Sequence, residues 1–259
     1  LYDENVQEAY DNAIQAVRIA EHPDVMLPTL HALDGFILGH GLERLELLPD
    51  EAVREFIGTY KPEHSLLDID HPVTYGPMDL QDYFFEHKRQ QAAAMEKALE
   101  IVPLVGEEYG RLSGRYYGLV EGYHLEDAEF ATVVLGSTVG TTRLVVDELR
   151  DQGIKAGLLK IRCFRPFPAA MVAQALGDKK AIAVLDRSLS FGAQGNPLFL
   201  EVVAALSTHG FSPKVVNYVY GLGGRDTVPA QIYQVYQDLI AIDREGLTGP
   251  TLRYLGVRE

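Results

Sequence analysis

The stretch Phe130-Ala-Thr-Val-Val-Leu135, followed at once by Gly136-Ser-Thr-Val-Gly140, decides the fold class of this chain. The first part is apolar except for Thr132, which is typical of a strand covered on both faces of a parallel sheet. The glycine-bounded turn leads into a predicted helix over about 141–151. Three further units of strand, loop and helix follow, with strands at 156–161, 181–185 and 215–219 and helices that start near Pro168, Pro197 and Pro229. This alternation predicts an open, mostly parallel α/β sheet.

The strand-to-helix loops of such a sheet lie at one edge, because the crossover connections are right-handed, and ligands and partners usually bind there. The loop Gly221-Leu-Gly-Gly-Arg-Asp226 fits a cradle for a phosphate or carboxylate, with Arg225 adding positive charge, and it also fits a plain turn before a helix. It matches neither a dinucleotide-binding G-x-G-x-x-G nor a P-loop. In the loop after the third strand, Arg187 and Gln194 fit a contact with an anion or a partner as well as a structural role.

Other reactive side chains have structural interpretations. The turn Gly136–Gly140 is not the G-x-S-x-G of hydrolases, and Ser137 and Thr138 are expected to cap a helix. The 8 histidines show no metal-ligand spacing, and Cys163, in or just after an apolar strand, is expected to be buried. Asp34 lies in an apolar stretch and needs a hydrogen-bonded partner if it is buried. We therefore assign no catalytic, cofactor-binding or metal-ligating residue to this chain.

The first half of the chain is organised differently from the second. The proline-rich stretch 42–78 has weak periodicity and predicts an ordered connector or an arm that wraps a partner. We expect the end of an α/β domain at 1–41, a connector with a long helix at 42–127, and a complete α/β domain at 128–259. The predicted elements are an amphipathic helix over 3–21, a short strand and turn over 25–38, a short helix near 50–57, and a helix over 79–109 that Asp79 caps and Pro103 kinks or ends.

Composition and charge exclude several functional classes. The chain has 259 residues, with 23 Lys and Arg against 37 Asp and Glu, so its formal net charge is −14. A chain this acidic is a poor candidate for binding nucleic acid. No apolar run approaches the ~18 residues of a membrane span, and the single cysteine excludes an iron–sulfur cluster or a cysteine-only zinc site held by this chain alone. Since the first residue is Leu1, we expect a longer polypeptide with a part upstream.

An ordered series of short motifs resembles the α subunit of 2-oxoacid:ferredoxin oxidoreductases, of which pyruvate synthase is the best known. The motifs cover nearly the whole chain in order, so the chain is similar to a C-terminal portion of that subunit. The strongest matches are Gly157-Leu-Leu-Lys-Ile-Arg162, Phe164-Arg-Pro-Phe-Pro168, Val184-Leu-Asp-Arg187, Ser190-Phe-Gly192 and Gly221–Asp226, and earlier matches lie at Glu4–Tyr10, Leu27–Leu38 and Gly114–Val120.

The resemblance implies the end of a thiamine-diphosphate-binding, pyrimidine-type domain, a connector, and a domain like the carboxyl-terminal domain of transketolase. It implies a cytoplasmic, CoA-acylating enzyme that oxidatively decarboxylates pyruvate or a related 2-oxoacid and passes electrons to ferredoxin or a similar acceptor. Thiamine diphosphate, Mg and [4Fe-4S] clusters would be bound mainly by β-, γ- and δ-type subunits, since the G-D-G motif is absent here. The chain is then a non-autonomous subunit, with His40, Arg187, Gln194, Arg225 and Asp226 at subunit contacts or near the site.

Two motifs depart from the family and leave alternatives open. Where the family commonly has Ser/Thr-His-Thr-Val-Glu-Pro, this chain has Gly39-His-Gly-Leu-Glu-Arg44, and the usual Arg-Asp-Val-Thr-Pro becomes Arg225-Asp-Thr-Val-Pro229. An aromatic 2-oxoacid such as phenylglyoxylate therefore stands beside pyruvate as a substrate. Two other classes remain: a stand-alone α/β module that binds a phosphorylated metabolite through Gly221–Arg225, and a transketolase- or dehydrogenase-type subunit without iron–sulfur partners.

Overall fold

The computed structural model describes residues 1–258, and their contacts divide the chain into two compact units. Unit 1 consists of Leu1–Ala9, His31–Leu45 and the chain from Leu119 onward, and unit 2 consists of Tyr10–Leu30 and Glu46–Gly118. Helix α1, Val6–Ala20, begins in unit 1 and continues in unit 2. None of the described helices combines the length and the hydrophobicity needed to cross a bilayer.

Unit 1 is built on a 6-stranded sheet with the strand order β1-β3-β2-β4-β5-β6. Strand β1 is antiparallel to β3, and the other neighbouring strands are parallel. The open, mostly parallel sheet predicted from the sequence is therefore confirmed. The strands are Val120–Tyr123 (β1), Phe130–Val134 (β2), Ala156–Ile161 (β3), Ala181–Asp186 (β4), Lys214–Val219 (β5) and Leu252–Tyr254 (β6).

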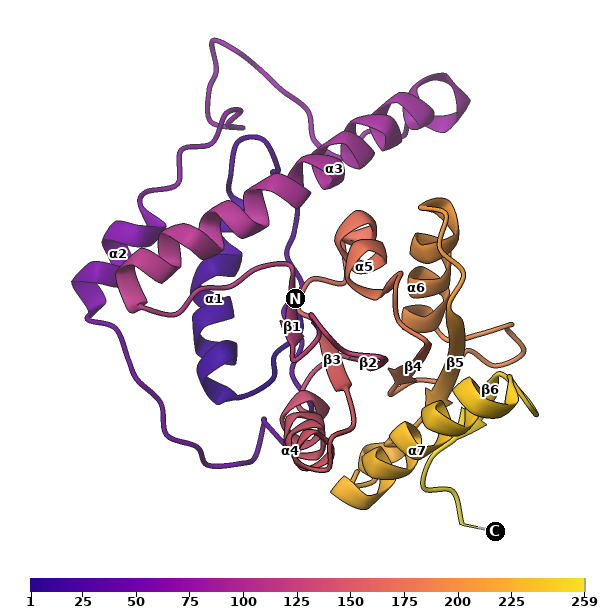
Figure 1. Cartoon of the computed structure of the whole chain (residues 1–259). Coiled ribbons are helices and arrows are strands. Elements are labelled where there is room, and N and C mark those ends of the chain that lie inside the picture. The colour runs from indigo at the N-terminus through magenta and orange to yellow at the C-terminus, as the bar shows by residue number, and fades with distance from the viewer. Residues whose placement is uncertain (259) are drawn as a thin grey trace. The chain divides into compact units, whose positions relative to one another are not determined.

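Helices cover both faces of this sheet. Helices α4 (Thr138–Asp151) and α7 (Pro229–Glu245) pack on one face, and α5 (Ala169–Leu176) and α6 (Pro197–Thr208) pack on the other (Figure 1). Every residue of β2, β3 and β4 is consequently buried, which explains why these strands are almost wholly apolar. The polar exception in β2 has a partner, because the Thr132 hydroxyl lies 2.8 Å from the buried Tyr236 hydroxyl, which donates to the Gly157 carbonyl at 2.8 Å.

The strand expected within Val25–Leu38 is absent, so that prediction is wrong. Ala32 forms only an isolated parallel bridge with Tyr2, and the chain then turns at Asp34, whose carbonyl accepts from the N–H groups of Leu38 and Gly39. Proline and the Asp-Gly pair interrupt the apolar run, so no extended ladder forms. Strands β1 and β6 were missed because they are short edge strands with partly exposed residues.

Unit 2 contains three helices: most of α1, then α2 (Asp50–Ile57) and α3 (Leu80–Ser113). The short helix predicted near 50–57 is confirmed. Helix α3 continues through Pro103, so the helix does not end there, whereas a kink at Pro103 stays a prediction. Proline inside a helix costs about 3 kcal/mol. The second half of α3 offsets that cost because it buries Ala98, Ile101, Val102 and Val105.

Asp79 stands at the start of α3 but forms no capping hydrogen bond with its side chain, so the predicted cap is wrong. The Asp79 carboxylate instead contacts the His87 ring, two turns along the helix.

Asp11 is the polar centre of unit 2. It has no exposed surface, and its carboxylate accepts from Arg115 Nε at 2.6 Å and from the hydroxyls of Tyr109 and Tyr117, each at 2.6 Å. Burial would raise the pKa of Asp11, but the hydrogen bonds from Arg115 and the two tyrosines outweigh burial and lower it. The carboxylate therefore stays ionised and joins α1 to the end of α3 and to the residues that follow it.

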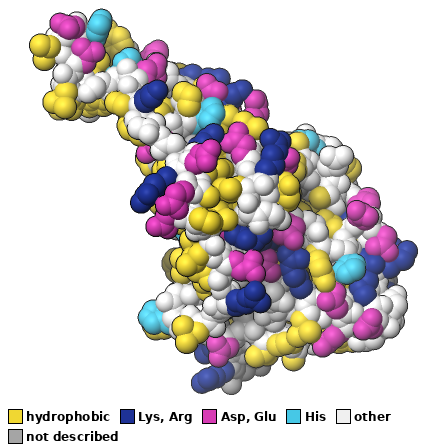
Figure 2. All heavy atoms as spheres, turned by 90° about the vertical axis from the view of Figure 1, so that its left-hand side faces the viewer, with side chains coloured by type: hydrophobic (Ala, Val, Ile, Leu, Met, Phe, Trp, Pro, Cys, Tyr) yellow, Lys and Arg dark blue, Asp and Glu magenta, His cyan; other side chains and the backbone are white. Residues whose placement is uncertain are grey.

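The surface carries charges of both signs. On the face shown in Figure 2, basic side chains lie among acidic ones, and hydrophobic side chains are exposed between them. That face therefore offers no extended basic area of the kind that binds nucleic acid.

Replacing the buried carboxylate tests its role. Asp11→Ala removes the buried carboxylate partner of Arg115, and we expect the free energy of unfolding to fall by about 3 kcal/mol, measured by urea denaturation. Because the folded-state pKa of Asp11 is lowered, this contribution is complete above the ordinary carboxyl pKa and is lost as the pH falls through the lowered value. Arg111→Ala, which removes an exposed pair with Glu107, is the control and should change stability by at most about 0.5 kcal/mol. Equal losses in the two variants would contradict the assignment.

Candidate functional site

The strand order of the sheet reverses between β2 and β4, and we use the word crevice for the position between the two loops at the carboxyl ends of these strands. The chain leaves β2 through α4 to reach β3 on one side of β2, and later it reaches β4 on the other side. Where the strand order reverses in this way, the two outgoing loops diverge to opposite faces, and ligands of open α/β sheets bind between them. Here the two loops carry Gly136 and Ser137 after β2, and residues 187–196 after β4.

Asp34 from the segment His31–Leu45 occupies this crevice. Its Oδ2 accepts from the Ser137 backbone N–H at 2.8 Å and from the Ser137 hydroxyl, and its Oδ1 lies 2.7 Å from Arg187 Nη1. Burial would raise the pKa of Asp34, but the Ser137 hydrogen bonds and the Arg187 charge outweigh burial and lower it. The ionised carboxylate thus lies at the start of α4, where the helix dipole favours negative charge.

Two glycines allow the chain to pack closely around this ion pair. Gly136 has φ +69°, and a Cβ atom added there would lie 2.9 Å from Asp34 Oδ2. Gly221 has φ +61°, and a Cβ atom there would lie 2.6 Å from Arg187 Nε. Both positions favour glycine for its positive φ and for its lack of a side chain.

A buried polar network anchors the loop that carries Arg187. The Asp186 carboxylate at the end of β4 accepts from the backbone N–H groups of Leu198 and Phe199, at 2.9 and 3.1 Å, and so caps α6. Asn217 Nδ2 donates to Asp186 at 2.9 Å, and Asn196 Nδ2 donates to Asn217 Oδ1 at 2.7 Å. Burial raises the pKa of Asp186 despite these donors. The loop after β4 is therefore fixed at both ends.

Of the predicted site residues, Arg187 is the one that lies in the crevice. Its guanidinium pairs with Asp34 and lies 5.5 Å from the centre of the Tyr220 ring. Tyr220 is buried, and burial raises its pKa to about 12. His40 lies in the exposed turn that follows Asp34, where its ring stacks on Phe36 at 4.8 Å between centroids.

The other three predicted residues lie on exposed loops at the same edge of the sheet. Gln194 is in the loop after β4, and Arg225 and Asp226 follow the 3₁₀ turn Leu222–Gly224 after β5. Arg225 Nη1 donates to the Gly256 carbonyl at 2.6 Å, which ties its loop to the chain after β6. Their placement at contacts with other subunits stays a prediction.

Sequence reasoning missed the roles of Ser137 and Asp34. Ser137 was expected to cap α4, but its side chain makes no capping hydrogen bond and donates to Asp34 instead. The one feature of the sequence that pointed to this contact was Asp34 itself, an acidic residue in an apolar stretch. Its partners are 103 residues or more away in sequence, so local patterns could not identify them.

A second charged cluster holds the first residues of the chain on the sheet. Lys160 of β3 is only 4% exposed, and its Nζ lies 2.9 Å from both Glu4 and Glu8. Burial would lower the pKa of Lys160, but the two carboxylates outweigh burial and raise it. Arg143 of α4 adds a 3.1 Å contact to Glu4. Each charge has an opposite partner, so we interpret the cluster as an anchor within unit 1.

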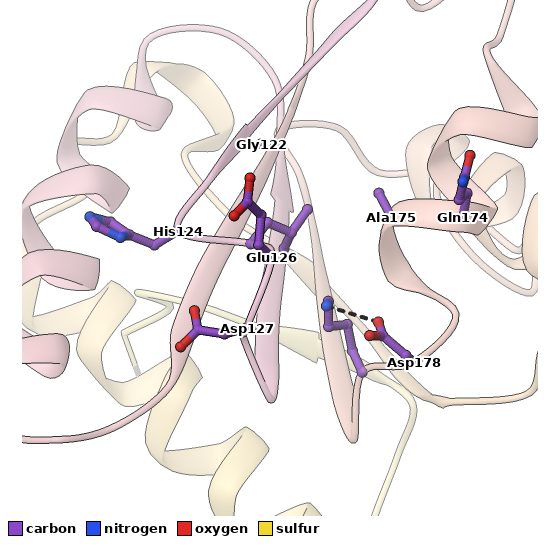
Figure 3. A pocket seen from close by; sticks show the side chains of 9 residues that line it. Gly122, His124, Glu126, Asp127, Gln174, Ala175 and Asp178 are labelled. Atoms are coloured by element: carbon purple, nitrogen blue, oxygen red, sulfur yellow. Dashed lines mark ion pairs between the residues drawn. The ribbon is translucent and has the colours of Figure 1, made fainter.

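The hollow shown in Figure 3 lies at the opposite edge of the sheet, near the amino ends of β2 and β4. It has a volume of about 590 Å³ and is lined by polar residues that include His124, Glu126 and Asp178. Among the described residues, no group of three or more His, Cys, Asp or Glu side chains could hold a metal ion. The hollow lies at the amino ends of the strands, whereas ligands of open α/β sheets bind at the carboxyl ends. It is therefore a weaker candidate site than the crevice at Asp34.

Cys163 is fully buried, as predicted, and burial raises the pKa of its thiol. A thiol in this environment is not activated as a nucleophile.

Comparison with known proteins identifies the class to which this fold and crevice belong. Residues 1–107 match a family described as pyruvate flavodoxin/ferredoxin oxidoreductase, thiamine diphosphate-binding, and residues 128–232 match pyruvate:ferredoxin oxidoreductase core domain II. The pyruvate synthase subunit PorA of Thermotoga maritima is 50% identical over 259 residues, which are 100% of this chain and 65% of that protein. PorA of Methanocaldococcus jannaschii is 44% identical over 87% of this chain and 58% of its own length. The ketoisovalerate oxidoreductase subunit VorA of Pyrococcus abyssi is 37% identical over 95% of this chain and 62% of its own length.

The chain therefore belongs to the family of 2-oxoacid:ferredoxin oxidoreductase α subunits. It spans 65% of the length of the Thermotoga maritima relative and 58% of the Methanocaldococcus jannaschii relative. The resemblance seen in the sequence motifs is confirmed.

Neutralising Asp34 tests the ion pair in the crevice. In Asp34→Asn the amide can still accept from Ser137 but leaves Arg187 without its opposite charge, and we expect a loss of about 1–3 kcal/mol of unfolding free energy at pH 7. Since the pKa of Asp34 is lowered in the folded state, the wild-type advantage shrinks as the pH falls through that lowered value. Asp24→Asn at an exposed position is the control and should have little effect. If the wild type and Asp34→Asn still differed by the same unfolding free energy below the lowered pKa of Asp34, the role of the charge would be contradicted.

Proposed function

We propose that this chain is part of the α subunit of a thiamine-diphosphate-dependent, CoA-acylating 2-oxoacid:acceptor oxidoreductase whose substrate is pyruvate. The observation that carries the proposal is the 50% identity with a pyruvate synthase subunit along all 259 residues. The ketoisovalerate oxidoreductase subunit is less similar, at 37% identity. The altered motifs at 39–44 and 225–229 left phenylglyoxylate open as a substrate, so it is tested beside pyruvate and ketoisovalerate.

In the proposed reaction, pyruvate and CoA give acetyl-CoA, CO₂, one proton and two electrons. The bond between C1 and C2 of pyruvate breaks, and the sulfur of CoA bonds to C2. Iron–sulfur clusters held by partner subunits would supply the path for the two electrons to ferredoxin or a similar acceptor. Each of these steps depends on a cofactor or cluster, and the protein supplies binding and orientation.

The described residues do not fit a complete site for thiamine diphosphate and Mg. Although residues 1–107 match a family model whose description names thiamine diphosphate, no metal-binding group of acidic, histidine or cysteine side chains is present among the described residues, and the sequence has no G-D-G motif. Asp34 also fills the crevice of the sheet. The single buried Cys163 cannot hold a [4Fe-4S] cluster. We therefore assign the binding of these groups mainly to β-, γ- and δ-type partner subunits.

The part that we assign to this chain is structural support at subunit contacts. Arg187 and Asp34 fix the turn that carries His40, and Gln194, Arg225 and Asp226 present polar groups at the carboxyl edge of the sheet. Polar, exposed loops on a rigid scaffold are the usual positions for recognition of partners. We place the assembled enzyme in the cytoplasm.

The assay of the whole complex tests the proposed function. We expect the full-length protein, co-expressed with its partner subunits without oxygen, to reduce a viologen dye in the presence of pyruvate and CoA. Pyruvate should give a higher kcat/KM than ketoisovalerate or phenylglyoxylate, and omission of CoA should stop turnover. The absence of reduction with every 2-oxoacid would overturn the proposal. A stable monomer that binds a nucleotide tightly would instead favour a metabolite-binding module.

A substitution at Arg225 separates assembly from chemistry. Arg225→Ala removes an exposed cation from the carboxyl edge of the sheet, and we expect the subunits to associate about tenfold more weakly, with unchanged activity per assembled complex. Arg244→Ala is the matched control, because Arg244 lines a hollow beside the amino end of β2 and not the carboxyl edge of the sheet. This substitution should leave assembly of the complex unchanged. An intact Arg225→Ala complex without activity would contradict this role.

A further inference from the structure

The end of unit 2 around the start of α3 exposes an unusual number of large apolar side chains. We call residues 66–85 the apolar tip. Its large hydrophobic side chains are between 57% and 90% exposed, whereas single isolated exposures are the rule on protein surfaces. They are Leu66, Leu67, Ile69, Tyr75, Met78, Leu80, Tyr83, Phe84 and Phe85.

The first part of α3 stands without packing support. Residues 80–93 are all exposed, which corresponds to about 20 Å of helix at ~1.5 Å per residue. From Ala98 onward the same helix buries a regular apolar stripe. This exposed end continues from the packed half of α3, and a surface that covers it would add the tertiary packing from which most helices in proteins gain their stability.

The apolar side chains at the start of α3 do not form a single stripe. Tyr83, Phe84 and Phe85 are consecutive, so they project about 100° apart around the helix axis. A helix that lies on a flat surface needs one apolar face, whereas a helix with apolar residues on several sides is enclosed. The covering surface is therefore a groove that contacts this helix end on more than one side.

Charge identifies the kind of partner. Asp70, Asp82 and Glu86 are exposed within or beside the apolar tip, and no ion pair involves them within the described part of the chain. The nearby cations are Lys88, which contacts Gln91 and lies 5.9 Å from the centre of the Phe84 ring, and Arg89, which lies 3.5 Å from Glu96. A second copy of this chain in a two-fold contact would bring the same acidic groups together.

We propose that the apolar tip inserts into an apolar groove, edged with Lys and Arg, on a different subunit of the same oxidoreductase complex. The identity of that partner as a subunit of the complex rests on the proposed function. The acidic rim favours encounter with a basic rim and disfavours self-association. The aromatic side chains provide the large buried contacts that dominate interface energies.

Truncating the aromatic side chains tests the insertion. In the full-length protein, co-expressed with its partner subunits, the double variant Phe84→Ala/Phe85→Ala should raise the dissociation constant of one subunit at least about tenfold, measured by native mass spectrometry over a dilution series. Leu104→Ala on the same helix is the matched control, because Leu104 is 47% exposed but lies in the supported half of α3. Equal dissociation constants for the two variants would overturn the inference.

A photo-crosslinking residue at position 85 identifies the occupant. A crosslink to a different subunit supports the inference, whereas a crosslink to a second copy or within the same polypeptide overturns it. Viologen reduction by the unmodified complex is measured in parallel. If the complex is active and the substitutions in the apolar tip leave its dissociation constant unchanged, the docking surface alone is refuted. An inactive complex that still depends on the tip refutes the proposed function alone.

Discussion

The carboxylate of Asp34 is the interaction on which unit 1 depends at its carboxyl edge. It joins the segment His31–Leu45 to the loop after β2 through Ser137 and to the loop after β4 through Arg187. Both loops leave the sheet where its strand order reverses, so one ionised group fixes the position at which open α/β sheets usually bind a ligand. In this chain Asp34 fills that position from within, through its contacts with Ser137 and Arg187.

The sequence predicted the sheet well because its central strands are covered on both faces. Burial at every position of β2, β3 and β4 produces continuous apolar runs, and these are the strongest strand signal in a sequence. The edge strands β1 and β6 are short and partly exposed, and they lack this signal. The run Val25–Leu38 is also apolar, but within it only Val25 and Leu38 are buried, and the run was mistaken for a strand.

The site was only partly predictable. Arg187 could be identified because it directly follows a buried strand, and chain order alone places such a residue at the binding edge. The contact of Asp34 with Ser137 could not be predicted, because the two residues lie more than 100 residues apart in the sequence. Ser137 illustrates the same limit: a serine before a helix is a good cap by local rules, but a distant carboxylate competes for its hydroxyl.

The division of the chain between the units has a consequence for the order of folding during synthesis. Unit 2 is complete once Gly118 has left the ribosome, whereas Leu1–Ala9 belongs to unit 1. The contacts of Glu4 and Glu8 with Lys160 require strand β3, which is made about 150 residues later. Glu4 and Glu8 must therefore wait for β3, an interior strand of the sheet, while the residues between them can already be folded.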